Sequence, residues 1–379
     1  RNIKQLGLTY LVYPGATHSR LQHALGAMHL LDMAIDTLRT KGLIITNEEA
    51  EAACAAILLH DIGHGPFSHA LEYSIVNGVS HEVLSKCFMQ QLNKELSDRL
   101  ALAIKIFDDN YPKKFLHQLI SGQLDMDRMD YIKRDSFFSG VTEGAIGSDR
   151  IIKMLQVVDD NLVVEAKGIY SIEKFLIARR LMYWQVYLHK TVVAAEQTLI
   201  KMLKRAKELA KNKVDVSSTP SLNYFLYNDI SIEQFTSSSP ETPNDALKYF
   251  SQLDDSDIMI AAKLWINHPD ETLSRLAHMV TNRKLLSISL KNTPFDHEQI
   301  KIYDDKFKSL LPEIAEHSNY FVFSDSISIH AYQPGDESIK ILYNNGLLSD
   351  IAEASDMLNA KALSDEVKKY FFCYPKELR

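Results

Sequence analysis

The sequence predicts a mainly α-helical fold, a helical bundle followed by a smaller α+β region. Apolar residues recur at helical spacing through most of residues 16–212. Strand-like runs become frequent only after residue 284. Between the two parts, the Ser- and Pro-containing segments at 217–221 and 236–240 have the composition of loops. We therefore expect a helical domain at residues 1–212 and an α+β accessory region at residues 213–379.

Two helices are expected at the start of the bundle. Apolar periodicity marks a helix over about His18–Lys41, and an Ala-rich helix should follow over Glu48–Leu59. Asn47 is the predicted N-cap of the second helix, because acidic residues fill the turn after it. Gly63 and Gly65, the latter followed by proline, must end this helix.

The remaining elements follow from the same patterns. Further helices of the bundle are expected at His81–Leu92, Glu95–Phe107, Phe115–Ser121 and, capped by Ser171, Ser171–Asn212. A hairpin over Leu155–Lys167 turns at Asp159, Asp160 and Asn161. In the accessory region we expect helices near Pro243–Leu253 and Ser256–Asn267, and strands at Leu285–Leu290, Tyr320–Phe323, Ser326–Ala331 and Ile339–Tyr343.

Composition and charge limit the class of protein. The 379 residues are 46% hydrophobic and 24% charged, as in ordinary soluble proteins, and no apolar run approaches a membrane-spanning length. The three cysteines lack the spacing of metal ligands, and their odd number argues against a disulfide framework. So few cysteines fit a reducing compartment, so we expect a cytoplasmic location. Residues 1–212 carry a net charge of +2 (26 basic, 24 acidic) and residues 213–379 one of −9 (16 basic, 25 acidic). A polyanionic substrate is therefore expected at the N-terminal part, and nucleic-acid binding is unlikely.

Histidine and aspartate cluster in the N-terminal part. Seven of the 14 histidines fall within the first 81 residues, several of them beside Gly, Pro, Ser or Asp. His60 and Asp61 end the Ala-rich helix, and the Gly/Pro loop that follows contains His64 and His69. A single His-Asp pair is expected by chance in a chain of this composition, so the clustering carries the argument. It indicates a metal or catalytic site.

Imidazole and carboxylate side chains together suit divalent ions such as Mn, Fe, Co, Ni, Zn or Mg. His60 and Asp61 point about 100° apart around the helix axis, which suits two neighbouring coordination positions. His23 follows Arg20 by three residues, so the imidazole could reach a metal while the guanidinium grips a phosphate. Asp127 is the best candidate for a fourth ligand. However, its acidic segment could equally be a salt-bridged helix face, and spacing does not decide which carboxylate binds.

Other polar residues could act on a substrate. His64, His69 and His81 could donate a proton or stabilise charge on phosphate, although His81 alone could equally be a surface histidine. A second group, on the long predicted helix, could reach a triphosphate if it is not simply a charged surface. It comprises Arg179, Tyr187 and Lys190.

Taken together, these residues resemble the HD-domain metal-dependent phosphohydrolases. The narrower resemblance is to the deoxynucleoside triphosphate triphosphohydrolase branch, which includes the vertebrate sterile-alpha-motif HD protein and bacterial dGTPase-like enzymes. The matching strings cover about residues 1–195. They are residues 3–7, 13–20, 60–69, 81–82 and 127–131, Asp135, and residues 179–190.

The resemblance implies a role for each matching residue. The metal ligands would be His23, His60, Asp61 and Asp127. Arg20 would hold the α-phosphate, with Arg128, Arg179 and, more weakly, Lys190 on the outer phosphates. The catalytic group would be His64 and His69 near the scissile phosphate, and His81 supported by Glu82. The sugar and base would be lined by Gln5, Leu6, Tyr131, Asp135 and Tyr187, with Asp135 on the 3′-hydroxyl.

The resemblance also implies an HD-domain helical bundle that hydrolyses a dNTP to deoxynucleoside and inorganic triphosphate as a homodimer or homotetramer. Two departures from the vertebrate pattern concern the substrate: Arg128 stands in place of a lysine, and residues 183–185 are more apolar. Two alternatives stay open. One is an HD phosphohydrolase for another phosphoester, such as a nucleoside monophosphate, and the other is a nucleotide-sensing protein without turnover.

Overall fold

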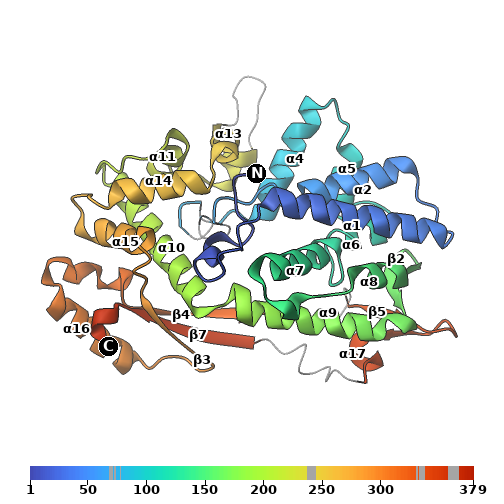
Figure 1. Ribbon diagram of the computed structural model, residues 1–379. Coiled ribbons are helices and arrows are strands. Elements are labelled where there is room, and N and C mark those ends of the chain that lie inside the picture. The colour runs from blue at the N-terminus through green and yellow to red at the C-terminus, as the bar shows by residue number, and fades with distance from the viewer. Residues whose placement is uncertain are drawn as a thin grey trace.

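A computed structural model describes residues 1–67, 71, 74–76, 78–236, 245–329, 332, 338–356 and 367–379. It confirms the mainly helical fold and the mixed α/β C-terminal region. Figure 1 shows two lobes, one built around α1 and α7 and the other around α10 and a small sheet. The helices α9 and α10 follow each other along the chain and join the lobes.

The lobe of α1 contains most helices of the N-terminal half. They are α1 (Arg20–Thr40), α2 (Asn47–Leu59), α4 (His81–Glu95), α5 (Ala101–Phe107), α6 (Lys114–Gln118), α7 (Met126–Ser139), α8 (Ser148–Met154) and α9 (Ile169–Met182). Short 3-10 turns lie at Gly7–Leu11, Thr142–Gly144 and Ala166–Gly168. The predicted hairpin is present as β1 (Leu155–Val158) and β2 (Asn161–Glu165), which continue into a sheet of order β1-β2-β5-β6 with β5 (Lys340–Leu342) and β6 (Leu348–Asp350).

The second lobe begins with α10 (Lys190–Lys211). Its other helices are α11 (Pro220–Tyr227), α12 (Ile232–Thr236), α13 (Asp245–Gln252), α14 (Asp255–Trp265), α15 (Glu271–Thr281) and α16 (His297–Leu310), with 3-10 turns at Pro312–Tyr320 and Lys376–Leu378. Its antiparallel sheet has the order β3-β7-β4, formed by β3 (Ser287–Lys291), β7 (Val367–Tyr374) and β4 (Phe323–Ile329). The short α17 (Ile351–Ala354) returns to the first lobe and contacts α9.

The core has two clusters of buried apolar residues. One contains residues between 27 and 186 together with Tyr332, Ile339, Ile341 and Ile351. The other contains Leu8, residues between 67 and 87, and residues from 193 to 378. The loop after α2 and the start of the chain therefore share a core with the C-terminal half. The predicted boundary between residues 212 and 213 stays a prediction.

Two predicted helix starts were wrong. Thr46, not Asn47, caps α2, because its hydroxyl accepts from the Glu49 N–H at 3.1 Å and the Glu49 carboxylate accepts from the Thr46 N–H at 2.8 Å. The helix expected from Glu95 begins only at Ala101, since Ser97 and Asp98 have φ angles of +54° and +63°.

The long helix predicted at Ser171–Asn212 is in fact two helices. The first, α9, starts at Ile169 rather than at a Ser171 cap, and a π-helical turn, Tyr183–Tyr187, ends it. The second starts at Lys190, where the His189 ring accepts from the Thr191 N–H at 3.2 Å. Such wide turns re-aim side chains and are common at functional sites.

The strand predicted at Tyr320–Phe323 was also wrong. Tyr320 ends a 3-10 turn, and the strand β4 starts at Phe323. Ala331, where a further strand was expected to end, lies outside the described residues.

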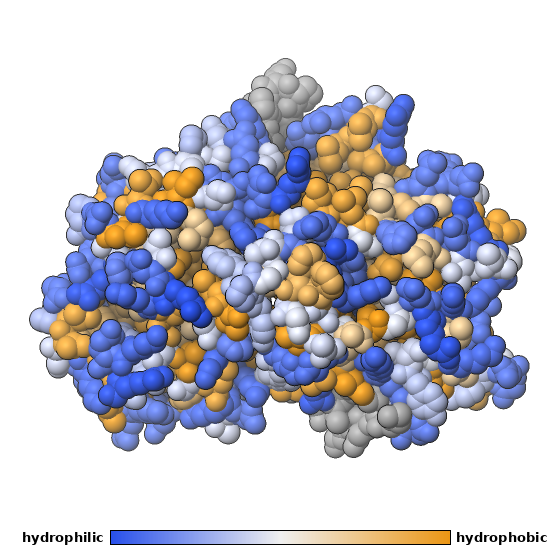
Figure 2. Space-filling model, viewed as in Figure 1, coloured by the Kyte–Doolittle hydropathy of each residue, from blue (hydrophilic) through white to orange (hydrophobic). Residues whose placement is uncertain are grey.

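The surface is mixed in polarity. On the face shown in Figure 2, hydrophilic residues alternate with smaller hydrophobic groups. Within the described ranges, no helix combines the length and the apolar character that a membrane crossing requires.

Candidate metal centre

Three helix ends bring the His/Asp cluster together. Ser19 caps α1 in a capping box with Gln22, which places His23 in the first turn. His60 is the C-cap of α2. Asp125 caps α7 by accepting from the Arg128 N–H at 2.6 Å, which places Asp127 in that first turn. Because α1 and α7 both begin here, their partial positive N-terminal charges favour an anion beside the cluster.

All four predicted metal ligands lie around one point. The Nε2 atom of His23 is 2.9 Å from Asp127 Oδ1 and 3.9 Å from Asp61 Oδ2. The Nε2 atom of His60 is 3.3 Å from Asp127 Oδ1 and 3.4 Å from Asp61 Oδ1. One ligand atom from each of His23, His60 and Asp61 lies within 4.8 Å of the others. This cluster could therefore hold a metal ion.

The two imidazoles are oriented as metal ligands require. The Nδ1 atom of His23 lies 2.8 Å from Asp130 Oδ2, and that of His60 lies 2.6 Å from the Ile57 carbonyl oxygen. These acceptors favour the tautomer with the proton on Nδ1 and the lone pair on Nε2. Both Nε2 atoms are buried and make no hydrogen bond within the described part of the chain. A divalent ion would give each of them a partner.

The charges around the cluster favour a cation at this point. Burial lowers the pKa of His23, but the adjacent carboxylates of Asp127 and Asp130 outweigh it and raise the pKa to about 10. Burial likewise lowers the pKa of His60, and Asp61 and Asp127 raise it to about 9. Burial raises the pKa of the Asp127 carboxyl, but the two histidines hold it well below its usual range. The carboxylates therefore stabilise positive charge at this point.

A further layer of side chains holds His23 in place. Asp130, which accepts from His23, is gripped by Arg134 through two bonds of 2.8 Å, from Nε and Nη2. Gly26 on α1 leaves room for this pair, because a Cβ atom there would lie 2.0 Å from Arg134 Nη2 and from Asp130 Oδ1. The sequence showed Asp130 only as one more acidic residue of its segment.

Two of the three predicted catalytic histidines, His64 and His81, lie together beside the cluster. His64 Nε2 is 3.4 Å from Asp61 Oδ1, and the His64 ring stacks on His81 with 3.8 Å between centroids. Burial and the nearby Arg20 lower the pKa of His64 to about 3, so its ring is neutral at physiological pH. Arg20 Nη1 donates to Asp61 Oδ2 at 2.7 Å. His69 lies outside the described residues.

A cavity of about 690 Å³ opens over the cluster. Of the predicted residues, those lining it include Gln5, Arg20, His60, Asp61, His64, His81, Glu82, Asp127, Arg128, Tyr131 and Arg179. Among the predicted substrate residues, all of which are described, Leu6, Asp135, Tyr187 and Lys190 do not line it. Lys190 lines a separate hollow with Trp184 and Lys369.

Asp135 is already engaged inside the protein. Its side chain is 1% exposed, Oδ1 is 2.7 Å from His18 Nε2, and Oδ2 accepts from the Tyr187 hydroxyl at 2.7 Å. The His18 ring in turn stacks on Phe138. Sequence reasoning gave His18 no role, because the partner lies 117 positions away.

Arg128 and Arg179, which both line the cavity, differ in their hydrogen bonds. Arg128 donates to the Gly122 carbonyl and to the carboxylate of Asp125. Arg179 is only 8% exposed, and its Nε and Nη1 atoms make no hydrogen bond to any described residue. A buried guanidinium without acceptors is costly unless an anion completes it.

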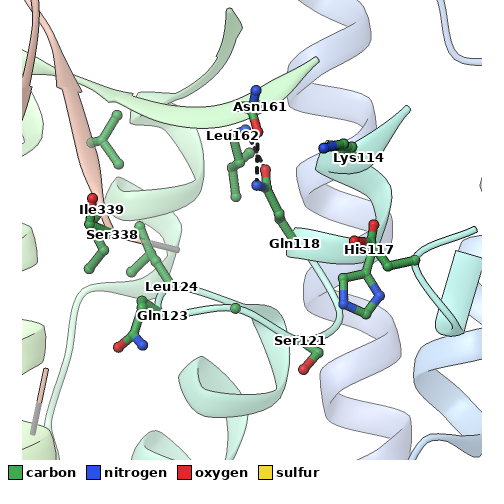
Figure 3. A pocket seen from close by; sticks show the side chains of 13 residues that line it. Lys114, His117, Gln118, Ser121, Gln123, Leu124, Asn161, Leu162, Ser338 and Ile339 are labelled. Atoms are coloured by element: carbon green, nitrogen blue, oxygen red, sulfur yellow. Dashed lines mark hydrogen bonds between the residues drawn. The ribbon is translucent and has the colours of Figure 1, made fainter. Parts of the chain in front are cut away.

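Sequence reasoning missed part of the cavity wall. Its further lining includes Val83, Lys86, Phe107, Asp108, His117, Ile120, Ser121 and Tyr183. His117 and Ser121 also line a smaller cavity of about 280 Å³, shown in Figure 3. There Gln118 donates to Asn161 Oδ1 at 3.1 Å and accepts from the Leu162 N–H at 2.7 Å. No pattern in the sequence points to these residues of the wall, which lie on α4, α5 and α6, just after α5 and α6, and in the π-helical turn.

Comparisons with known proteins agree with this geometry. The HD domain matches residues 20–135, and the HD associated region matches residues 146–246. YwfO of Bacillus subtilis is 31% identical, with an alignment covering all of this chain and 86% of that protein. The crystal structure of a phosphohydrolase from Bacteroides thetaiotaomicron is 55% identical, with a TM-score of 0.92, and covers 98% of this chain and 91% of that one.

A more distant relative has a named activity. The deoxynucleoside triphosphate triphosphohydrolase SAMHD1 homolog of Dictyostelium discoideum is 29% identical. That alignment covers 56% of this chain and 45% of the Dictyostelium protein.

Proposed function

This chain belongs to the HD-domain phosphohydrolases, and from that premise we propose that it hydrolyses deoxynucleoside triphosphates at the α-phosphorus. The products are a deoxynucleoside and inorganic triphosphate. The observation that carries the proposal is the buried, incompletely paired guanidinium of Arg179 in the same cavity as the His/Asp cluster. A polyphosphate can supply both the missing acceptors and the countercharge.

We assign the metal ligands to His23, His60, Asp61 and Asp127. Two neutral imidazoles and two carboxylates would leave the site without net charge when a divalent ion is bound. Such an ion supplies water with a lowered pKa and offsets negative charge on the phosphate. The Nε2 atoms of His23 and His60, which are buried and make no hydrogen bond to any described residue, support this assignment.

The phosphates are held by three guanidinium groups. Arg20, which contacts Asp61, takes the α-phosphate beside the cluster. Arg128 and Arg179 take the outer phosphates, because both line the same cavity. Since these groups are fixed before substrate arrives, they stabilise the charge that develops in the transition state without reorganising.

A histidine completes the reaction by protonating the leaving group. A water oxygen forms a bond to the α-phosphorus and gives up one proton to solvent, while the bond from phosphorus to the 5′-oxygen breaks. The 5′-oxygen keeps the bonding electron pair and takes a proton from the histidine. Burial and Arg20 lower the pKa of His64, which supports another histidine as the donor. We assign the proton to His81 or His69, with Glu82 supporting His81.

The sugar and base are assigned to the wall that contains Gln5 and Tyr131, both of which line the cavity. Asp135 is buried, does not line the cavity and already pairs with His18 and Tyr187, so a 3′-hydroxyl in the cavity would not contact it in this conformation. This occupied carboxylate is the observation that favours the alternative, hydrolysis of another phosphoester such as a nucleoside monophosphate. A homodimer or homotetramer and a cytoplasmic location stay predictions.

Product analysis tests the proposal. The purified protein is incubated with Mn or Mg and each of the four dNTPs, and nucleoside, monophosphate, triphosphate and orthophosphate are separated. Nucleoside with triphosphate is the expected result, and Asp61→Ala should abolish it. Monophosphate or orthophosphate would mean that the substrate is wrongly assigned. If metal-loaded protein binds dNTPs but forms no product, the nucleotide-sensing alternative is favoured.

A further inference from the structure

A buried carboxylate in the C-terminal half holds two segments at the rim of the cavity. Asp255, in the first turn of α14, is 3% exposed. Its Oδ2 accepts from the backbone N–H of Lys4 at 3.0 Å and from Lys4 Nζ at 3.3 Å. Its Oδ1 accepts from the backbone N–H of Phe67 at 3.2 Å, across 188 positions of sequence. One side chain thus joins three regions of the chain.

Both segments carry residues of the cavity. Gln5, which lines the cavity, directly follows Lys4. His64, which also lines it, precedes Phe67 by three residues. The other end of the His64 loop is fixed on α4, because the Gly63 N–H donates to Ser85 Oγ at 2.9 Å. The loop is therefore held at both ends, once by α4 and once by Asp255.

The backbone of the loop needs this support. Phe67 has a φ angle of +54°, a conformation that is costly for a bulky residue and persists only where its surroundings impose it. Its side chain is 3% exposed in the core shared with the C-terminal helices. Close packing adds to the constraint, since a Cβ atom on Gly65 would lie 3.2 Å from Phe250 of α13.

We propose that Asp255 is a positioning residue, through which the C-terminal half fixes the rim segments that carry Gln5 and His64. It acts without touching the substrate or the metal cluster, and this gives part of the accessory region a function in catalysis. The inference rests on the proposed function only for its effect on turnover, because the hydrogen bonds themselves are independent of the substrate.

Asp255→Ala tests the proposal against a matched variant of the same helix. Asp254→Ala removes the N-cap of α14, whose side chain accepts from the Ser256 N–H at 2.7 Å, without touching Lys4 or Phe67. Three quantities are measured on each Mn-loaded full-length protein. They are hydrogen exchange of the segments containing Lys4 and Phe67, Mn affinity, and kcat and KM for dNTPs and for bis(p-nitrophenyl) phosphate.

For Asp255→Ala we expect faster exchange in both segments, unchanged Mn affinity, and a fall in kcat of about 10-fold or more from misplaced rim groups. Asp254→Ala should weaken the helix but leave kcat and both exchange rates near those of the parent. Lys4→Ala removes the Nζ contact with Asp255 but keeps the backbone N–H bond. Its effect on exchange and kcat should therefore be smaller than that of Asp255→Ala.

Two results would overturn the inference: unchanged exchange in Asp255→Ala, or a loss of turnover no larger than in Asp254→Ala. Failure of the proposed function is distinguishable from both. If the parent hydrolyses the nitrophenyl ester but no dNTP, the substrate assignment fails. The comparison of the two aspartate variants on the ester then still decides the role of Asp255.

Discussion

The floor of the cavity and its rim are built in different ways. The floor is the His/Asp cluster, whose members sit at the ends of α1, α2 and α7, and α1 packs on both other helices. The rim takes Gln5 and His64 from non-helical segments, Arg179 from α9 and Tyr183 from a π-helical turn. The floor is held by neighbouring helices, whereas the rim depends on contacts such as those of Asp255. Metal binding and substrate handling should therefore respond separately to mutation.

Substitution of Arg179 on the rim should cause the largest loss of catalytic efficiency while Mn affinity stays unchanged. Arg179→Met should lower kcat/KM by about 100-fold, because charge-assisted hydrogen bonds to phosphate contribute about 1.5–3 kcal/mol. The same change should stabilise the substrate-free protein by about 1 kcal/mol, since it removes a buried guanidinium with unmet donors. Steady-state kinetics, thermal unfolding and Mn titration measure the three quantities, and Mn affinity should not change.

Arg180→Met is the control, because it removes the same charge one position along α9 from a side chain that does not line the cavity. Activity retained in Arg179→Met, or lost equally in both variants, would mean that no anion completes the Arg179 site. Weaker Mn binding in Arg179→Met would show that rim and floor are coupled.

A second test changes the floor behind the ligands. Asp130→Asn keeps the shape of the side chain but weakens the acceptor for His23 Nδ1 and the two bonds to Arg134. Metal affinity should fall by about 10-fold or more, as for other groups that orient ligating histidines. Mn competition with a chelator measures the affinity, and visible absorption of the Co-loaded protein reports changed ligand geometry.

The neighbouring Asp135→Asn is the matched variant. Its carboxylate is also buried but contacts His18 and Tyr187 instead of the cluster, so Mn affinity should equal that of the parent. Equal losses in both variants would point to a general disturbance of α7 and would remove Asp130 from the metal site.

The residues of the floor could be predicted from the sequence, whereas the contacts that hold the rim could not. His23, His60 and Asp61 could be grouped from chemical type and helical spacing, which are local properties, whereas Asp127 was singled out among its acidic neighbours only by the family resemblance. The structure brings all four together. The contact of Asp255 with Phe67 joins residues 188 positions apart, and no local pattern encodes such a distance.

The rim also contains breaks in regular structure that periodicity cannot show. Apolar spacing continues through residues 183–187, so it predicted one helix where the chain makes a π-helical turn. In the same way, the expectation that Asp135 contacts a sugar did not include His18, which already occupies that carboxylate. The chemical type of each candidate residue can be taken from the sequence, whereas the partners of buried polar groups are known only from the fold.

The smallest effect is expected from a substitution at the end of α2 that lies away from the metal ligands. It tests whether the geometry of the floor depends only on contacts close to the ligands. Glu49, in the first turn of α2, accepts from Tyr111 at 2.7 Å and from Lys113 at 2.8 Å. Burial raises the pKa of its carboxyl, but Lys113, Tyr111 and the Thr46 N–H outweigh it and lower the pKa to about 2. A carboxyl with a lowered folded-state pKa stabilises the protein above its unfolded pKa of about 4.3, and loses that contribution as pH falls toward 2.

Glu49→Gln should therefore reduce the free energy of unfolding by about 2 kcal/mol at pH 7, with a difference from the parent that shrinks below about pH 4. Urea unfolding at several pH values measures it, and the exposed Glu48→Gln on the same turn should cost much less. Mn affinity should be unchanged, because His60 lies at the opposite end of α2 and is oriented by the Ile57 carbonyl. A fall in Mn affinity would mean that strain at one end of α2 reaches the ligands at the other, and that the floor depends on distant contacts as the rim does.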